Sequence, residues 1–132
     1  MNDRYLYRAK RKNWRELPKE TWWVEGYLYG IWERRYILWG MTNDVPNMVE
    51  VDPSTICQCT GLRDKNGKMI WENDIVTGWF DDKRITGYIM YGSNAIFFIE
   101  RKGLYGIHLD NSQDWLEVIG NIFDNPELLE VG

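Results

Sequence analysis

The sequence predicts a mainly β protein. Short runs rich in β-branched and aromatic residues recur along the chain, and clusters of Gly, Asn, Asp and Pro separate them. One of these clusters contains the pair Asn66-Gly67, which is typical of a tight β-hairpin turn. Because short strands at this spacing commonly build small barrels or sandwiches, we expect one of these two architectures.

The amino-terminal part, residues 1–50, is expected to form an aromatic-rich β subdomain. Residues 22–29 alternate between two faces with the period of a strand, and apolar side chains occupy both faces. A second apolar run at 36–39 is suited to antiparallel pairing with the first. Turn-forming residues then dominate 41–53, so we expect a loop there and a subdomain boundary after residue 50.

The remainder, residues 51–132, is expected to form a single β body with a short tail. Its expected strands cover residues 55–59, 75–80, 84–91, 95–101, 105–109 and 115–123. The pair Asn66-Gly67 predicts a two-residue turn of type I′, in which both central residues have positive φ. The tail places Pro126 at a first helical position and has room for one or two helical turns. We find no internal sequence repeat.

Residues 74–91 have the outline of a small SH3-like barrel. A strand leaves an acidic turn at Asp74, and Gly87 stands where the next strand would bend sharply. Glycine permits such a bend because it lacks a Cβ atom. The pattern therefore favours a barrel of this type in the carboxyl-terminal part.

Three segments of the chain carry motifs of one family. Residues 51–62 contain Asp-Pro followed by Gln-x-Thr-Gly-Leu, and residues 118–129 contain Val-Ile-Gly-Asn-Ile-Phe followed by Asn-Pro-Glu-Leu-Leu. Residues 23–28 add a shorter amino-terminal element. With these motifs the chain resembles the YopX family of small proteins encoded by bacteriophages and prophages, over about residues 7–129.

The resemblance implies a β-rich fold with an SH3-like barrel in the carboxyl-terminal part, and a phage or prophage context. It implies no reaction, because no established activity accompanies the family. Two positions depart from the family pattern: Asn73 stands where glycine is common, and Cys59 where an aromatic residue is usual. Asparagine is the residue next most able to adopt the left-handed backbone conformation, so we expect the turn at Asn73 to be preserved.

The sequence has no arrangement of residues typical of a catalytic or cofactor site. Three carboxylate pairs could each hold a divalent cation, but we expect them to serve turns: Glu72 with Asp74, Asp81 with Asp82, and Asp110 with Asp114. The only histidine, His108, lies in an expected strand, and no serine has the surroundings of a nucleophile. Cys57 and Cys59 leave the same face of an expected strand and are too few for a structural zinc site, so we expect buried, reduced thiols. We therefore expect a non-enzymatic protein with no small-molecule substrate.

The aromatic residues near the amino terminus are candidate contacts for a protein partner or for a second copy of the chain. Tryptophan and tyrosine are frequent anchors of protein interfaces, although packing in the protein's own core is the alternative. The candidates are Trp14, Trp22, Trp23, Tyr27, Tyr29 and Trp32. We expect a binding module that acts through protein–protein interaction or self-association.

A basic amino-terminal segment offers an alternative function, which is nucleic-acid binding. Basic side chains there could contact phosphates while neighbouring tryptophans stack on bases. The residues concerned are Arg4, Arg8, Lys10, Arg11, Lys12 and Arg15. Because the chain carries a net charge of −4, the same segment could instead dock on the protein's own acidic surface or stay solvated.

The sequence also bears on location. It has no apolar run long enough to cross a membrane and no secretory signal at its start. Reduced thiols are typical of a reducing compartment. We therefore expect a protein of the bacterial host's cytoplasm that does not act on a membrane.

Overall fold

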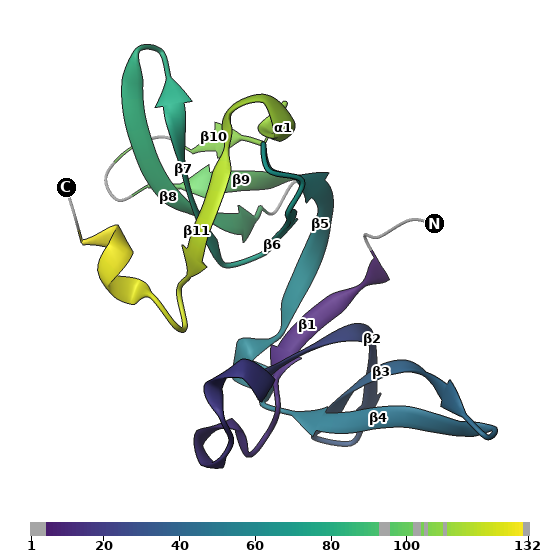
Figure 1. The fold of residues 1–132 in the computed structure, drawn as a ribbon. Coiled ribbons are helices and arrows are strands. Elements are labelled where there is room, and N and C mark those ends of the chain that lie inside the picture. Colours follow the sequence, from purple (N-terminus) through teal and green to yellow (C-terminus); the bar gives the residue numbers. More distant parts are fainter. Residues whose placement is uncertain (1–4, 93–95, 102–103, 105, 110, 131–132) are drawn as a thin grey trace. The chain divides into compact units, whose positions relative to one another are not determined.

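The computed structural model describes residues 5–92, 96–101, 104, 106–109 and 111–130 (Figure 1). Over these residues the protein is mainly β, with two antiparallel sheets and one short α-helix. The chain divides into two compact units, the first ending at Cys59 and the second beginning at Thr60. In the described part of the chain, no helix is long and apolar enough to cross a membrane.

The first unit is built from an antiparallel sheet with the strand order β4-β3-β2-β1-β5. The strands are β1 (Tyr7–Lys10), β2 (Trp23–Ile31), β3 (Arg34–Thr42), β4 (Val45–Val51) and β5 (Cys57–Arg63), and β5 continues into the second unit. Two 3-10 turns, η2 (Trp14–Glu16) and η3 (Lys19–Thr21), lie between β1 and β2. A third, η4 (Pro53–Thr55), precedes β5.

Strand β1 lies in the basic segment, where the sequence analysis expected none. It pairs with β2 through Ala9↔Val24 and Lys10↔Trp23, and with β5 on its other side. Basic residues occupy alternate positions of this strand. On the face between them Ala9 is buried in the core, and Tyr7 packs against the core while partly buried. A four-residue strand with these two inward side chains has little hydrophobic signal, so the sequence did not indicate it.

The expected loop over 41–53 is wrong, because β3 and β4 form a hairpin there. Asn43 and Asp44 make its two-residue turn with φ of 52° and 66°, a left-handed conformation that these two residue types tolerate. Pro46 is compatible with β4 because this strand lies at the edge of the sheet. The first unit therefore extends past residue 50, to Cys59.

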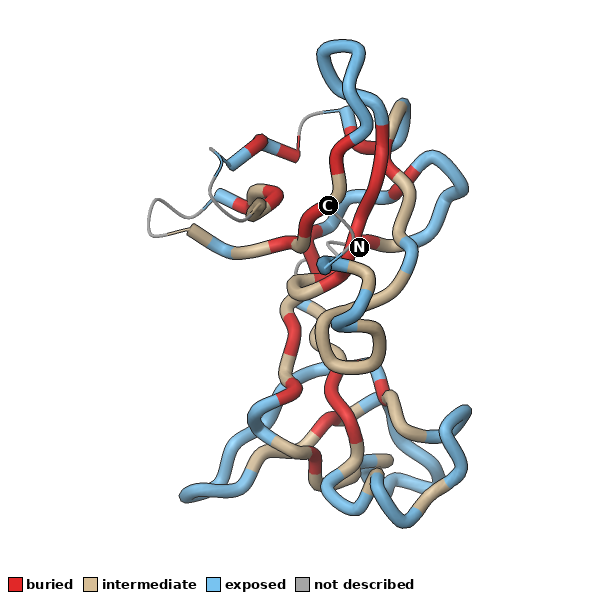
Figure 2. The backbone as a smooth tube through the Cα atoms, turned by 90° about the vertical axis from the view of Figure 1, so that its left-hand side faces the viewer, coloured by how far each residue is buried: buried red, intermediate tan, exposed pale blue. Residues whose placement is uncertain are grey.

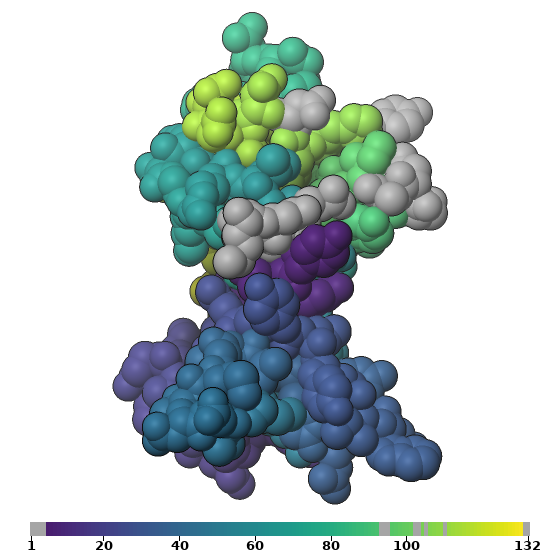
Figure 3. Space-filling model, turned by 90° about the vertical axis from the view of Figure 1, so that its right-hand side faces the viewer, coloured from purple at the N-terminus to yellow at the C-terminus, as the bar shows by residue number. Residues whose placement is uncertain are grey.

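The core of the first unit lies on one face of its curled sheet. Ala9, Val24, Ile37 and Val51 are buried there, as the red segments of its strands show (Figure 2). The sheet curls because the end of β4 pairs with the chain just after β1, through the bridge Arg11↔Val51. The opposite face of β2, β3 and β4 carries exposed apolar side chains. Atoms of these strands are drawn in blue in Figure 3.

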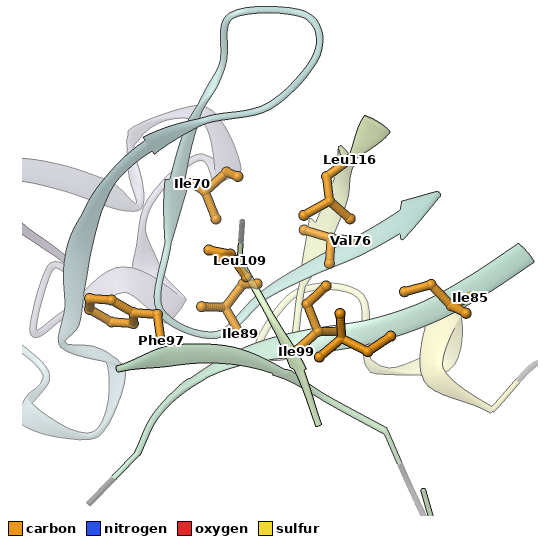
Figure 4. Packing of buried hydrophobic residues seen from close by; sticks show 9 residues of the cluster. Ile70, Val76, Ile85, Ile89, Phe97, Ile99, Leu109 and Leu116 are labelled. Atoms are coloured by element: carbon orange, nitrogen blue, oxygen red, sulfur yellow. The ribbon is translucent and has the colours of Figure 1, made fainter. Parts of the chain in front are cut away.

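The second unit contains a sheet with the order β10-β9-β8-β7-β11. Its elements are β6 (Met69–Trp71), which pairs with β5, then β7 (Asp74–Phe80), β8 (Lys83–Tyr91), β9 (Phe97–Glu100), β10 (Ile107–His108), α1 (Ser112–Trp115), β11 (Glu117–Asn121) and the 3-10 turn η5 (Pro126–Leu129). Its buried core consists of Ile70, Val76, Ile85, Ile89, Phe97, Ile99, Ile107, Leu109 and Leu116 (Figure 4). A strand was expected in the region of each of these strands except β6, and the helical turn at Pro126 is confirmed. The helix α1 was not expected, and Trp115, expected in the closing strand, is its last residue.

The backbone conformations of two turns in the second unit can be compared with those expected from the sequence. The hairpin at Asn66-Gly67 is confirmed but its type is wrong: only Gly67 has positive φ, at 80°, and the loop is closed by the backbone of Asp64 and Lys68. Glycine in the left-handed position is the usual end of such a longer loop. Asn73 has φ of 72°, so the left-handed turn expected there is confirmed.

The two units share one strand order. In each, four strands form a meander, a helical turn follows, and a fifth strand returns beside the first: β1–β4, η4 and β5, then β7–β10, α1 and β11. The sequence shows no repeat, so the likeness lies in topology alone. Among the described residues, the second sheet has open edges at β10 and β11, and the expected SH3-like barrel is not confirmed.

Candidate functional site

The six candidate aromatic residues of the first unit separate into two groups. Three tryptophans, Trp14, Trp22 and Trp23, are half-buried around the end of β1. The other three are exposed: Tyr27 and Tyr29 on β2 at 47% and 48%, and Trp32 in the following turn at 94%. The first group is therefore suited to packing within the unit, and the second to contacts at its surface.

The three tryptophans enclose the side chain of Lys10. Its Nζ lies 3.9 Å from the ring centroid of Trp14, 4.4 Å from that of Trp22 and 5.5 Å from that of Trp23. Trp14 and Trp22 meet edge to face with centroids 4.8 Å apart. Lys10 is only 1% exposed, so this cation–π cage holds a residue of the chain itself.

Hydrogen bonds fix the tryptophans of the cage. Trp22 Nε1 donates to the Leu17 carbonyl at 3.0 Å, and Trp14 Nε1 donates to Asp52 Oδ2 at 3.2 Å. Burial alone would raise the pKa of Asp52, but hydrogen bonds from Ser54 and Trp14 and the charge of Arg15 together lower it. A carboxylate that stays ionised in this way anchors the β1–β2 connection on η4.

Two arginines of the basic segment lie against the same tryptophans. The Arg8 guanidinium carbon is 4.9 Å from the Trp23 centroid, and that of Arg15 is 4.2 Å from the Trp14 centroid. Arginine stacks well on indole rings because its charged group is planar and weakly hydrated. Both side chains therefore contribute to the packing of the first unit.

The other basic candidates also contact the protein itself. Arg11 Nε donates to the Thr21 carbonyl at 3.0 Å, and Lys12 Nζ forms an ion pair with Glu50 at 2.9 Å. Arg4 lies outside the described residues. The five basic candidates that the structure describes thus all contact the first unit, one of them through a carboxylate and the others through tryptophan rings or a backbone carbonyl.

An exposed apolar surface covers the other end of the same sheet. Directly paired residues of an antiparallel sheet lie on one face, and the pairings are Tyr27↔Leu38, Tyr29↔Tyr36 and Leu38↔Met48. Ile31 continues the alternation on β2, and Met41 joins the same face after the bulge of β3, where it pairs with Pro46. We name this surface the outer face; it consists of Tyr27, Tyr29, Ile31, Tyr36, Leu38, Met41 and Met48.

Charges of both signs lie at the border of the outer face, where Glu25 shares the face of Tyr27 on β2 and pairs with Arg8. Arg34 pairs with Ile31, and Glu50 pairs with Tyr36, so both lie on this face. A hydrogen bond to Tyr36 raises the pKa of Arg34, and the charge of Glu50 raises it further. The border is therefore close to neutral, and the centre is apolar.

Trp32 stands in the two-residue turn between the paired residues Ile31 and Arg34. Its φ is 55°, and the Arg35 guanidinium holds the turn by donating to the Trp32 carbonyl at 2.9 Å. A bulky residue in the left-handed region costs about 1–2 kcal/mol relative to the usual conformation. Neither burial nor backbone preference explains a tryptophan here, and such an outlier points to a role outside the fold.

Comparison with known proteins places the chain in a family. The model of the family described as YopX protein matches residues 7–130. The chain belongs to the YopX family. A crystal structure of protein EF1440 from Enterococcus faecalis is similar, with 26% identity and a TM-score of 0.52 over 93% of this chain and 96% of that chain. The comparison with curated proteins finds no match.

In this YopX-family chain, the outer face includes residues that the sequence analysis did not single out. Ile31 shares the parity of Tyr27 and Tyr29 on β2, so strand alternation could have found it. Leu38 and Met48 depend on the pairing of β2, β3 and β4. That register includes a bulge between Leu38 and Gly40, which no short-range signal indicates.

The remaining candidates of this YopX-family chain are one histidine and two cysteines. His108 is exposed on the short strand β10, and Cys57 and Cys59 are buried thiols, as the sequence analysis expected. Over the described ranges, no three His, Cys, Asp or Glu side chains are grouped as metal ligands. The outer face with Trp32 is the candidate site.

Proposed function

We propose that this YopX-family chain is a phage- or prophage-encoded, non-enzymatic binding module whose outer face and Trp32 contact a protein. One observation carries the proposal: β2 presents Tyr27, Tyr29 and Ile31 on one side, all about half exposed, and ends at a tryptophan that is 94% exposed. Exposed apolar surfaces of this extent are typical of interaction sites. Aromatic residues supply most binding hot spots.

The charges of the first unit support a protein partner over nucleic acid. A nucleic-acid surface needs an excess of accessible positive charge to contact phosphates. Here Lys10 is enclosed, Lys12 is paired with Glu50, and the border of the outer face carries both signs. Nucleic-acid binding through the basic segment would require these contacts to break, so we regard it as the alternative.

A site-specific photo-crosslinker tests the proposal. Placed at Tyr29 in the full chain within bacterial cells, it is expected to trap a protein of defined mass, while the same group at the exposed Tyr5, outside the outer face, is expected to trap none. Trp32→Gly should abolish the adduct without loss of stability, because glycine suits the left-handed turn. Equal labelling from both positions, or none from Tyr29, would contradict the proposal.

The alternative has its own measurement. Fluorescence anisotropy with labelled single-stranded DNA, duplex DNA and RNA is expected to show no salt-dependent binding. Tight binding that weakens steeply with salt, and that is lost when Lys12 and Arg15 are neutralised, would favour the nucleic-acid function instead.

Two finer expectations belong to the same proposal. We propose an SH3-like fold for the second unit; its meander, helical turn and returning strand support this, and an experimental structure would test whether β10 approaches β11.

We also propose a cytoplasmic location, which fits the buried thiols of Cys57 and Cys59. Fractionation of cells expressing the full chain would test it, and recovery outside the cytoplasm would contradict it.

A further inference from the structure

The proposed function does not identify the protein partner. The following inference rests on that function and identifies the partner. We infer that the outer face packs against the outer face of a second copy of this chain, with a two-fold axis passing near Leu38. Leu38 belongs to the middle strand of the face, β3, and pairs with Tyr27 on one side and Met48 on the other. A two-fold axis there makes each face the partner of itself.

The size of the surface suits a pairing of this kind. Tyr27, Tyr29, Ile31, Met41, Met48 and Trp32 all keep a third or more of their area exposed. With side-chain areas on the order of 150–250 Å² for the aromatic residues and somewhat less for the others, they expose roughly 600 Å². A stable interface buries about 800 Å² on each partner, so the outer face together with Trp32 supplies most of the required area, and the polar rim must supply the rest.

The charges of the surface are also compatible with a second copy. Arg34 and Glu50 lie at the border with opposite signs, so the face can oppose itself without net repulsion. An interface core that is poor in charge and rich in tyrosine and methionine is the composition expected of protein contacts. This face has no patch of a single charge that would attract a strongly charged partner.

The sheet edge at β4 is less suited to this role than the face. Pro46 lacks a backbone N–H, and the Glu50 carbonyl already accepts a hydrogen bond from the Lys12 N–H at 3.0 Å. Outward backbone groups alternate along a strand, so between these two residues only Met48 offers both its N–H and its carbonyl to another strand. Pairing of two copies through β4 would therefore be short, which favours the face over the edge.

Light scattering after size exclusion of the full chain tests the inference. At about 50 µM, a concentration at which a micromolar interface is mostly occupied, the wild-type protein is expected at twice the chain mass of 15.8 kDa. Leu38→Glu and Leu38→Lys should each give the single-chain mass, because like charges meet at the two-fold axis. An equimolar mixture of the two variants should recover the doubled mass, because unlike charges then meet.

Two further variants keep the test decisive. Tyr5→Glu is the matched control, an exposed position outside the outer face, and should leave the doubled mass unchanged. If the Leu38 variants fail to fold, Tyr29→Glu at a half-exposed position should give the single-chain mass on its own.

The outcomes separate this inference from the proposed function. A single-chain mass for the wild type, a doubled mass for every variant, or no recovery on mixing folded Leu38 variants would overturn the second-copy inference. A crosslink from Tyr29 to a different protein would then leave the proposed function standing. Failure of both the scattering and the crosslinking results would remove the proposed function as well.

Discussion

Replacement of Asp64 by asparagine perturbs a carboxylate that joins three parts of the second unit. Its side chain is only 2% exposed. Oδ1 accepts from the backbone N–H groups of Asn66 and Lys68 at 2.9 and 2.8 Å, and Oδ2 accepts from that of Val118 at 2.9 Å. Asparagine has one oxygen, so in Asp64→Asn an NH₂ group must face one of these N–H donors.

The size and pH dependence of the effect follow from these contacts. A buried donor without an acceptor costs about 1–3 kcal/mol. The remaining hydrogen bonds are also weaker, because the amide oxygen that accepts them carries no negative charge. We therefore expect the free energy of unfolding to fall by about 2–3 kcal/mol at neutral pH. Burial alone would raise the pKa of Asp64, but the hydrogen bonds from Val118, Lys68 and Asn66 and the charge of Lys68 lower it. The folded pKa therefore lies below the unfolded one.

A group with a lowered folded pKa stabilises the protein above its unfolded pKa and loses that effect as the pH falls through the folded value. The difference between wild type and Asp64→Asn should be full above about pH 4 and shrink below it. Urea denaturation followed by tryptophan fluorescence, at several pH values, measures this difference.

The matched control for this prediction is Asp82→Asn. Asp82 is exposed and has φ of 63°, a conformation that asparagine adopts equally well, so its replacement should change stability by no more than about 0.5 kcal/mol. The reasoning is refuted if Asp64→Asn is as stable as the wild type, or if the difference persists unchanged into acid.

Further predictions concern the first unit and are checked by the same denaturation. Lys10→Ala empties the tryptophan cage and should lower the free energy of unfolding by about 2 kcal/mol or more, with a red shift of the emission, whereas Lys12→Ala should cost at most about 1 kcal/mol. Similar losses for both would contradict the cage. Gly26→Ala would place a Cβ against the Leu38 carbonyl and should cost about 1–3 kcal/mol, while Gly30→Ala meets only a flexible side chain and should cost less. The reverse order would show that the register of β2 and β3 is wrong.

The sequence predicted the β class and most strands of the second unit, because their apolar runs and turns are local signals. The left-handed turn at Asn73 is an example, since asparagine at a position where the resembled family commonly has glycine indicates the conformation. The hairpin of β3 and β4 was missed although Asn43 and Asp44 are good turn residues, because Pro46 argued against a strand. Its place at the sheet edge, which permits that proline, is a tertiary fact.

The candidate site was only partly predictable for the same reason. The aromatic residues were found by composition, but which of them enclose Lys10 and which stay exposed depends on how the β1–β2 connection folds back. The contribution of Leu38 and Met48 depends on strand register across β2, β3 and β4. The strain at Trp32 is visible only in its φ angle.

Oxidative footprinting of the full chain tests the protein-binding role of the outer face most directly. The oxidation rates of Trp32, Tyr29 and Tyr5 would be measured in dilute purified protein and again in concentrated protein and in host lysate. We predict that Trp32 and Tyr29 lose reactivity under the second conditions while Tyr5, exposed and outside the outer face, keeps it. Equal rates under all conditions, or equal protection of all three residues, would contradict a binding role for this face.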